Sequence, residues 1–385
     1  MTKIIDITKR VYSGGTPDTR KSEYWNGDIK WLSSGETRNN FIFDTDKKIT
    51  ELGVNNSSTK LASKGSIVMA CAGQGFTRGQ TSYLMDDMYI NQSVICIEPD
   101  DNKVDGLYLY YFFKNNYQLL RSLSNDHSSR GSITTAMIKD FEVNFPDIDI
   151  QKRISNILYS IDQKIELNNK INNNLYEMCN VLYHQLLDDN ESNIEYKTIG
   201  EIAKKVITGK TPSTKNKEYW GGNIPFITIP DMHNQVFTIN TERYITKEGA
   251  KSLIPKNSIS VSCIATVGLV SINDKDSQTN QQINSIVIEN DYDLYYLFEF
   301  LTEQEQYMKS IAGGSTTYNI NKNTFENIQV PYLNKELIIE YDKKVRPMFE
   351  KIKSNQISND TLSQLRDILL PKLMNGEIDL NNIEI

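Results

Sequence analysis

Two stretches of the chain carry apolar residues in steps of three and four, the spacing of one face of a long helix. The first lies between residues 151 and 187, and the second runs from about residue 335 to residue 374. We expect two long helices that pair with each other as an antiparallel coiled coil, because each one follows a globular segment of the same chain.

Single residues refine this helical pattern. Pro347 interrupts the second stripe and predicts a kink or a restart near Arg346. Gly376 follows the last apolar position and is typical of a helix C-cap. Asn168 and Asn355 occupy equivalent places in the two stripes. They could form a buried asparagine pair that fixes register, or both could face solvent, and the sequence leaves these alternatives open.

The rest of the chain has a different pattern. Residues 1–150 and 196–333 mix short β-rich runs with loops rich in Gly, Asn, Ser and Thr. Each region also contains one aromatic helix candidate, at residues 107–123 and 294–311. We therefore predict an α+β domain in each region, with loops projecting from a β scaffold. The predicted strands are residues 66–70, 90–97, 258–264 and 282–288.

The two halves also repeat each other in sequence. SGGTPDTRKSEYWNGDIKWL at 13–32 matches TGKTPSTKNKEYWGGNIPFI at 208–227, an offset of 195. The match continues through Cys71 and Cys263 and ends in the helical stripes. A period this long is not that of a solenoid. It indicates a duplicated domain-plus-helix unit, which favours a pseudo-two-fold symmetric arrangement with segments 1–150, 151–190, 191–333 and 334–385.

Composition narrows the functional classes. Of 385 residues, 38% are hydrophobic and 24% charged, as in an ordinary soluble protein. No apolar run approaches the length of a membrane span and the N-terminus lacks a signal peptide, so we expect a cytoplasmic protein. The four cysteines, at 71, 96, 179 and 263, and the three histidines are too scattered for a zinc site.

Net charge is −7, which argues against strong attraction to phosphates. The two domain regions are nearly neutral, however, with 17 basic and 19 acidic residues in 1–150 and 13 and 14 in 196–333. We expect any DNA binding to be weak until a more basic partner joins the protein.

Four repeated signatures resemble the DNA-specificity (S) subunits of type I restriction-modification systems. EYWNGDI and EYWGGNI are similar to the start of their target-recognition domains, and segments 130–146 and 313–333 to the end. Segment 151–178 resembles the family's central spacer helix, and TLSQLRDILLPKLMNGEI at 361–378 its distal helix. The resemblance covers essentially the whole chain.

The resemblance implies a non-catalytic subunit with two target-recognition domains, each reading half of a split double-stranded DNA site. It implies two adenine-N6 methyltransferase subunits that use S-adenosylmethionine, and restriction translocase subunits that use ATP and Mg²⁺. No cofactor would be bound by this subunit itself. The helices would set the length of the unread gap between the half-sites.

Readout of base edges needs Arg for guanine and Asn or Gln for adenine, on loops that reach the major groove. Domain one contains six arginines and domain two only Arg243, so the second half-site could favour A·T pairs. The base-readout candidates are Arg38, Gln74, Arg78, Gln80 and Arg130 in domain one, and Thr228, His233, Asn234, Thr266, Gln282, Ser315, Thr316 and Tyr318 in domain two.

Other positions could contact the DNA backbone, which positions the protein without specifying sequence. For the two Thr-Pro pairs, at 16–17 and 211–212, a structural turn is an equal alternative. Tyr24-Trp25 and Tyr219-Trp220 fit core aromatics better than stacking platforms, because bases in a duplex are already stacked. The backbone candidates are Lys9, Arg10, Thr16, Lys204, Lys205, Lys210 and Thr211.

No catalytic motif competes with DNA recognition. The sequence has no GxxxxGK[ST] phosphate loop, no GxGxxG and no Asn/Asp-Pro-Pro-aromatic motif. Two alternatives stay open at this stage. One is a duplicated protein-interaction module, which the acidic pI of about 5.3 favours. The other is the specificity subunit of a related system with a fused methyltransferase-nuclease.

Overall fold

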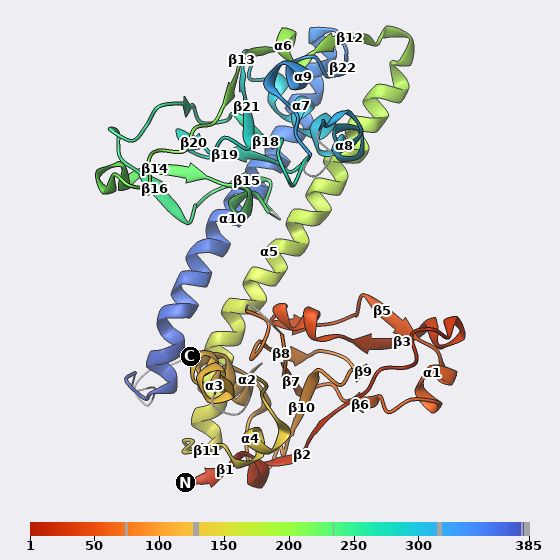
Figure 1. Ribbon diagram of the computed structural model, residues 1–385, viewed down its shortest axis with the longest axis vertical. Coiled ribbons are helices and arrows are strands. Elements are labelled where there is room, and N and C mark those ends of the chain that lie inside the picture. Colours follow the sequence, from red (N-terminus) through yellow and green to blue (C-terminus); the bar gives the residue numbers. More distant parts are fainter. Residues whose placement is uncertain (74–75, 126–130, 234, 314–317, 379, 381–385) are drawn as a thin grey trace. The chain divides into compact units, whose positions relative to one another are not determined.

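The computed structural model describes residues 1–73, 76–125, 131–233, 235–313, 318–378 and 380. The chain divides into two compact units, of which unit 1 is Met1–Gln163 with Ser363–Ile385 and unit 2 is Lys164–Leu362. Each unit therefore contains one globular domain together with a segment of each of the two long helices (Figure 1).

Unit 1 is built on one five-stranded and one four-stranded sheet. In Figure 1 the four-stranded sheet lies at the end of the unit away from helix α5 (Ile148–Asp189). The five-stranded order is β2 (Thr8–Ser13), β10 (Val94–Pro99), β7 (Ile67–Ala70), β8 (Thr81–Leu84) and β4 (Phe41–Ile42); the four-stranded order is β5 (Lys47–Ile49), β3 (Trp25–Leu32), β9 (Met88–Ile90) and β6 (Lys60–Ala62); β1 (Thr2–Lys3) pairs with β11 (Glu142–Val143).

Unit 2 has the same sheets in the same order, strand for strand, which is the structural form of the sequence repeat. The five-stranded order is β13 (Ala203–Thr208), β21 (Ile283–Ile288), β18 (Ile259–Ser262), β19 (Val270–Asn273) and β15 (Phe237–Thr238); the four-stranded order is β16 (Arg243–Ile245), β14 (Trp220–Ile227), β20 (Ser277–Thr279) and β17 (Leu253–Ile254); β12 (Glu195–Thr198) pairs with β22 (Gln329–Tyr332). The prediction of two similar α+β domains is confirmed.

Three of the shorter helices also correspond between the units. Each aromatic segment forms two helices rather than the single predicted one, because the first helix has its C-cap at Asn116 in unit 1 and at Glu303 in unit 2. The helices are α1 (Glu51–Asn55), α2 (Gly106–Asn115), α3 (Tyr117–Asn125) and α4 (Thr135–Asp140) in unit 1, and α6 (Ile199–Ile202), α7 (Asp293–Thr302), α8 (Glu305–Ile311) and α9 (Lys322–Glu326) in unit 2; the 3₁₀ turns are η1 (Ile4–Ile7), η2 (Ser22–Tyr24), η3 (Ser34–Arg38), η4 (Glu191–Asn193), η5 (Lys217–Tyr219) and η6 (Ile229–Met232). Helices α2, α3 and α4 of unit 1 correspond to α7, α8 and α9 of unit 2, whereas α6 takes the place of the 3₁₀ turn η1.

The predicted strand at 90–97 is also divided. Asn91 makes a turn in which its side-chain Oδ1 accepts a hydrogen bond from the amide of Ser93 at 2.9 Å. The turn separates β9 from β10, so the two strands enter different sheets. An asparagine that satisfies the backbone two residues on is a common way to make such a turn.

Within each unit, α5 packs antiparallel against α10 (Lys335–Met374). In unit 2, Asn168 Nδ2 donates to Asn359 Oδ1 at 2.7 Å, and Asn355 Nδ2 donates to Asn172 Oδ1 at 2.8 Å. Asn168 and Asn355 are both buried, which decides between the two alternatives. They are not partners of each other, because the antiparallel register places each one opposite an asparagine one turn away.

The end of α10 agrees with the prediction and its middle does not. Gly376 adopts a φ of 72°, and the amides of Gly376 and Glu377 donate to the carbonyls of Leu373 and Lys372, which is a Schellman C-cap. Of the kink or restart expected near Arg346, the restart is wrong, since α10 is continuous through Pro347. Pro347 is exposed, and so is Lys343, the residue four positions earlier whose carbonyl loses its helical partner.

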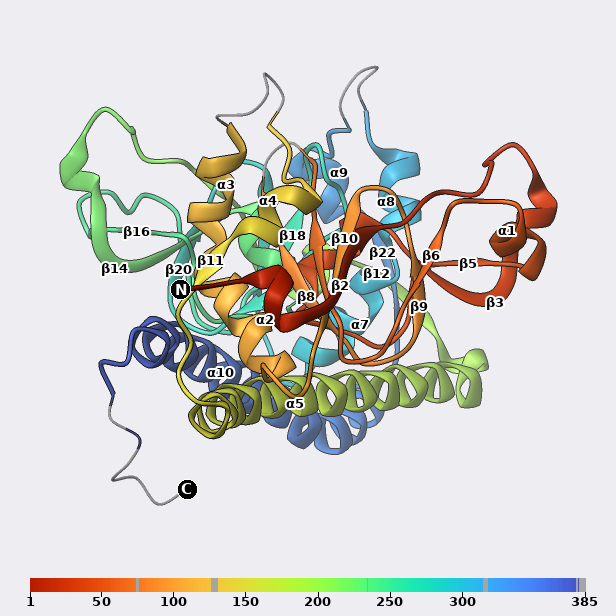
Figure 2. The same ribbon diagram turned by 90° about the horizontal axis from the view of Figure 1, so that it is seen from below.

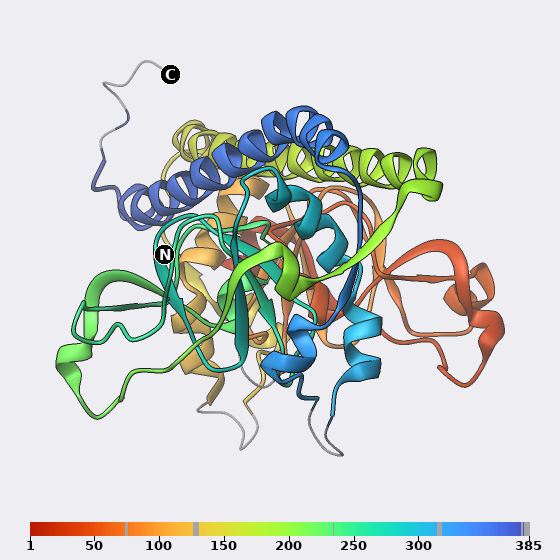
Figure 3. The ribbon, with the colours of Figure 1, turned by 90° about the horizontal axis from the view of Figure 1, so that it is seen from above.

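Helix α2 connects the five-stranded sheet of unit 1 to the long helices. Its aromatic residues join Ile67 and Ile95 of the sheet, Leu158 of α5 and Leu370 of α10 in one buried cluster. Figure 2 shows α2 between α5 and the strands, and Figure 3 shows α7 in the same place in unit 2. In the part of the chain that the structure describes, no helix is long and apolar enough to cross a membrane.

Candidate nucleic-acid interface

The repeated EYW motif forms a strand bulge in both units. Asn26 has a φ of 62° and Gly221 a φ of 80°, and the ladder register shifts directly after them in β3 and β14. The tryptophan before each bulge packs edge-on against another ring, with centroids 5.0 Å apart for Trp25–Trp31 and 5.3 Å for Trp220–Phe226. These aromatics are structural, as the sequence indicated.

The repeated Thr-Pro motif is also a built turn. The hydroxyl of Thr16 donates to the side-chain oxygen of Gln92, and that of Thr211 donates to Gln281 Oε1 at 2.5 Å. Gly14 lies so close to the next strand that a Cβ would come within 1.9 Å of the Ile90 carbonyl oxygen. Both threonine hydroxyls therefore have a partner inside the domain, and the turn holds the glycine-containing segment against β9 or β20.

Arg38 and His233 occupy the same place in the two units, at the end of η3 and directly after η6, and both are exposed. Each turn has a capping box, made by Ser33 with Glu36 in unit 1 and by Thr228 with Asp231 in unit 2. Thr228 is thus buried at the cap, where its hydroxyl donates to Asp231 Oδ2 at 2.6 Å.

The segment that carries Arg38 is held firmly. The buried Ser82 hydroxyl has contacts of 3.1 Å to the Thr37 carbonyl and 2.5 Å to the Asn39 carbonyl, one on each side of Arg38. Lys114 Nζ donates to Asn40 Oδ1 at 2.8 Å. Burial, assisted by the nearby Arg366 charge, lowers the pKa of Lys114 to about 8. Sequence reasoning missed Ser82 and Lys114, because neither lies near Arg38 along the chain.

The loop between β7 and β8 contains two further candidates. Arg78 is buried and Gln80 is half-buried. Arg121 Nη1 of α3 donates to the Arg78 carbonyl at 3.2 Å, and Tyr117 of α3 donates to the Phe76 carbonyl at 2.6 Å. Helix α3 therefore fixes this loop, and Phe76, Tyr117 and Arg121 are residues that sequence reasoning missed; their signal is an aromatic in a polar glycine-rich loop.

In unit 2, two candidate segments lie together. The amide of Ala265 donates to the Tyr318 carbonyl at 3.0 Å, and Ile264 forms a β-bridge with Asn319. This brings the exposed Thr266 and Tyr318 into one region. Gln282 is half-buried and accepts a hydrogen bond from Asn280 Nδ2 at 3.0 Å. Gln74, Arg130, Asn234, Ser315 and Thr316 lie outside the described residues.

The basic candidates on the edge strands β2 and β13 have acidic neighbours. Lys9 Nζ lies 2.9 Å from Asp101, whose hydrogen bond raises the pKa of the exposed Lys9 ammonium. Arg10 donates two hydrogen bonds to Glu98, at 2.8 and 2.7 Å. The equivalent Lys204 lies 3.8 Å from Glu289. These partners weaken the attraction that the edge strands could offer to phosphates.

Two other backbone candidates in unit 2 differ from these. Lys205 and Lys210 are exposed, and neither has an acidic partner within 4.0 Å among the described residues. The Lys210 carbonyl accepts a hydrogen bond from Gln278 Nε2 at 2.7 Å, which fixes the backbone from which its side chain extends.

Comparison with known proteins places this arrangement in a family. The family model described as "Type I restriction modification DNA specificity domain" matches the chain twice, at residues 2–177 and 191–364. The chain belongs to this family. It is a DNA sequence-specificity subunit of a type I restriction-modification system, a non-catalytic recognition subunit.

Individual relatives agree with the family model. The HindI specificity subunit of Haemophilus influenzae is 33% identical over 376 residues, covering 76% of this chain and 82% of the relative. The MjaIX specificity subunit of Methanocaldococcus jannaschii is 27% identical over 417 residues, covering 99% and 94%. The crystal structure of an S subunit from M. genitalium shares the fold, with a TM-score of 0.63, 16% identity and coverage of 99% and 96%.

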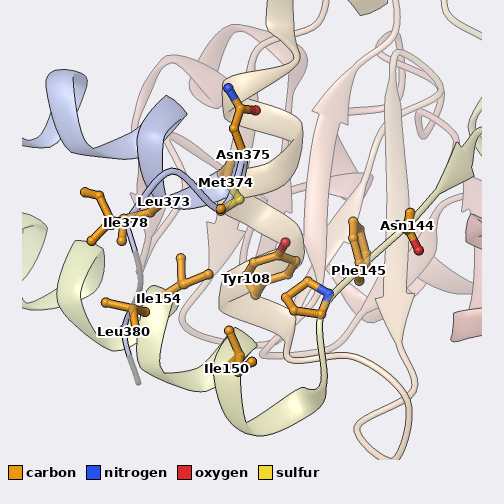
Figure 4. A pocket seen from close by; sticks show the side chains of 12 residues that line it. Tyr108, Asn144, Phe145, Ile150, Ile154, Leu373, Met374, Asn375, Ile378 and Leu380 are labelled. Carbon is orange, nitrogen blue, oxygen red and sulfur yellow. The ribbon is translucent and has the colours of Figure 1, made fainter. Parts of the chain in front are cut away.

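The specificity subunit also has a pocket of about 440 Å³ in unit 1, where α2, the start of α5 and the end of α10 meet (Figure 4). Tyr108, Ile150, Ile154 and Leu373 line it, and the buried Leu380 follows the C-cap of α10 into it. Its lining is mixed, because Asn144 and Asn375 lie among the apolar residues, and we regard it as part of the packing around the end of α10. Among the described residues no group of three or more His, Cys, Asp or Glu could hold a metal ion.

Proposed function

We propose that the two domains read the two halves of a split double-stranded DNA target, and that the subunit positions two adenine-N6 methyltransferase subunits and the restriction translocase subunits on it. In this proposal S-adenosylmethionine, ATP and Mg²⁺ belong to the partner subunits, and this subunit binds no cofactor. The assembly would act in the cytoplasm.

One observation carries the proposal. Arg38 and His233 stand on equivalent turns of the same scaffold, yet their chemistry differs. An arginine donates two hydrogen bonds to guanine, whereas a histidine offers one donor or acceptor at a time. Two domains that recognise different half-sites need the same backbone turn with a different side chain at its end, and Arg38 and His233 meet this requirement.

The remaining candidates take roles within this proposal. Gln80, Thr266, Gln282 and Tyr318 would approach base edges, together with Gln74, Arg130, Asn234, Ser315 and Thr316. Arg78 and Thr228 are buried, so they would hold the reading loops rather than contact bases. Lys205 and Lys210 are better placed for phosphates than Lys9, Arg10 and Lys204, which have acidic neighbours. Thr16 and Thr211 would support the turn.

The test is single-molecule methylation sequencing of host DNA with and without the gene, followed by Arg38→Ala and His233→Ala. Deletion should remove N6-methyladenine from one split motif. Loss of a guanine contact costs about 1–3 kcal/mol and relaxes one base position. Each variant should therefore relax only its own half of the motif, and each serves as the control for the other. Relaxation of both halves by one variant would contradict one domain per half-site.

Salt dependence separates this function from a protein-interaction module. Affinity of the assembled complex for its motif should fall steeply with added salt, in proportion to the number of phosphates contacted. A module that binds only proteins would show no such dependence on DNA. Purification of the complex also shows whether methyltransferase and nuclease are separate chains or one fused chain.

A further inference from the structure

Phe76 is an unusual side chain for a surface loop. It is 80% exposed, and among the large hydrophobic side chains that the structure describes only Met1 is more exposed. It lies in the β7–β8 loop, in the same short segment as Arg78 and Gln80. Single exposed hydrophobic side chains are common on protein surfaces, but the carbonyl of Phe76 is held by a hydrogen bond from Tyr117.

Three sets of hydrogen bonds fix the loop. At its base, the amide of Gly79 donates to the Ala70 carbonyl and the amide of Ala70 donates to the Gln80 carbonyl, both at 2.9 Å. At its tip, the hydroxyl of Tyr117 donates to the carbonyl of Phe76 itself. Arg121 Nη1 then donates to the Tyr117 hydroxyl at 2.8 Å, and its guanidinium lies 5.4 Å from the centre of the Tyr117 ring.

Close packing adds to these bonds. Gly79 has a φ of 86°, and a Cβ there would contact the Tyr117 ring at 3.4 Å and the Arg121 stem at 3.5 Å. The backbone of Phe76 is therefore held while its ring points into solvent. Since the ring contributes little to the core, a presented aromatic of this kind points to an external contact.

Unit 2 shows that the scaffold does not require this aromatic. From Cys71 to Gly79 the chain advances eight residues, whereas from the equivalent Cys263 to Gly268 it advances five. The shorter loop places Val267 before the glycine and buries it. Both glycines have positive φ and donate to equivalent carbonyls, those of Ala70 and Ser262, while the segment before Gly79 is three residues longer and contains Phe76.

The major groove offers one apolar group for such a ring. Each base pair presents donors and acceptors there, and only thymine adds a C5-methyl group, which phenylalanine can contact. Stacking is not available, because bases in a duplex already stack on each other. We propose that Phe76 reads a thymine methyl group in the half-site bound by domain one, an inference that rests on the proposed function.

The test is a coupling measurement between the ring and the methyl group. The complex with its methyltransferase subunits is bound to DNA carrying its methylated motif, and each thymine of the first half-site is replaced in turn by uracil, which lacks only the methyl group. At one position the wild-type Kd should rise about four-fold, the value of exposing one buried methyl group. With Phe76→Ala the same replacement should change Kd by less than about 1.5-fold, since one partner of the contact is already gone.

Two further variants control this result. Leu119→Ala removes an exposed apolar side chain from α3 in the same unit and should leave the four-fold uracil effect intact. Tyr117→Phe removes the hydroxyl that holds Phe76 and should reduce the coupling while leaving binding to unrelated DNA unchanged. Uracil in the second half-site should give no coupling to Phe76→Ala.

Three outcomes would overturn the proposal. One is a first half-site without thymine on either strand. Another is a uracil effect that is equal in the wild type and in Phe76→Ala at every position. The third is a Phe76→Ala complex that assembles poorly with its methyltransferase yet binds DNA normally once assembled, which would make Phe76 a protein contact. A wild-type complex that does not prefer its motif over scrambled DNA would instead contradict the proposed function.

Discussion

The junction of the long helices with the aromatic helix is filled by polar side chains in unit 1 and by apolar side chains at the equivalent positions of unit 2. Where α2, α5 and α10 meet in unit 1, Asp162 and Arg366 form a 2.7 Å ion pair, and Tyr111 donates to Asp162 Oδ2 at 2.6 Å. The Asp162 side chain is only 2% exposed and that of Arg366 12%. In the repeat these three positions correspond to Phe349, Cys179 and Phe298 of unit 2, which are all buried and apolar.

The polarity is reversed one residue further along the aromatic helix. Glu299 of α7 is completely buried in unit 2, with Asn180 Nδ2 at 3.5 Å from Oε2 and no hydrogen-bond partner for Oε1 among the described residues. Its equivalent in unit 1 is Phe112. Each copy thus buries a different polar group at the same junction. The comparison teaches that the fold needs volume there, while the choice of polar side chains distinguishes one copy from the other.

The largest effect should come from removing one member of the ion pair. Arg366→Leu leaves Asp162 buried without its cation, and a broken buried pair costs about 3–5 kcal/mol. Cys179→Ala at the equivalent position in unit 2 should cost only about 1 kcal/mol, because it removes a small apolar group. Denaturant unfolding followed by circular dichroism measures both.

A double variant tests the explanation. Asp162→Leu combined with Arg366→Leu should recover most of the loss, because no unpaired charge stays buried. A loss below about 1 kcal/mol in Arg366→Leu alone would mean that Asp162 is satisfied without its arginine.

The second prediction concerns pH and involves only unit 2. Burial, opposed by the hydrogen bond from Asn180 and assisted by the nearby Glu303 charge, raises the pKa of Glu299 from an ordinary value of 4.5 to about 8. Between these values the folded state holds a proton that the unfolded state releases, so the stability of unit 2 should fall as pH rises from about 4.5 to 8. The total change should be a few kcal/mol.

Hydrogen exchange of α7 amides, corrected for intrinsic rates, measures this stability at pH 5, 6.5 and 8. Glu299→Gln should remove the pH dependence in that window. The exposed Glu191→Gln is the matched control and should leave the slope unchanged. A slope that persists in Glu299→Gln would assign the effect to another group.

At the helix pairing, the repeat keeps the same buried polar residue in both copies, as Asn168 and Asn355. Asn355→Leu leaves Asn172 without its partner, at a cost of about 1–3 kcal/mol. The equivalent Asn168→Leu should cost less, because Asn359 still donates to Asn169 Oδ1 at 2.8 Å. Denaturant unfolding ranks the two variants, and a larger loss for Asn168→Leu would contradict the pairing described here.

Much of this architecture could be predicted from sequence, because the apolar periodicity and the internal repeat are both visible in the order of the residues. The two long helices, the two α+β domains and the C-cap at Gly376 follow from spacing alone. The break of the aromatic helix at Asn116 and the continuation of α10 through the exposed Pro347 could not be predicted, because both depend on what each residue faces in the fold.

The candidate site was less accessible to sequence reasoning. The exposure of Arg38 and His233 on equivalent turns agrees with their selection as readers. Arg78 and Thr228 have the right chemistry for readout but are buried. Ser82, Lys114 and Tyr117 hold the loops from other elements, and such supports leave no signal near the residues that they position.

The smallest loss of stability should come from giving unit 1 the side chains that unit 2 has at this junction. Tyr111→Phe, Asp162→Phe and Arg366→Cys together give unit 1 the side chains of unit 2. Phe349 stacks on Tyr295 with centroids 4.2 Å apart, and Tyr108 is the equivalent tyrosine in unit 1, so the ring introduced by Asp162→Phe should find the same partner. Replacing a buried ion pair by apolar groups of similar total volume is often neutral or stabilising by about 1–4 kcal/mol.

We therefore expect the triple variant to unfold at a denaturant concentration at least as high as the wild type does. It should, however, lose part of its preference for pairing α5 with α10 over pairing two copies of α5. With Asp162 and Arg366 in place, two copies of α5 that paired with each other would bring Asp162 opposite Cys179 and bury its charge without a partner. The exchange removes that penalty and should raise the fraction of domain-exchanged dimer, which size-exclusion chromatography with light scattering measures. A triple variant that stays monomeric at all concentrations would show that contacts other than this ion pair specify the pairing, and the asparagine pairs could not be those contacts because α5 and α10 carry them at equivalent positions.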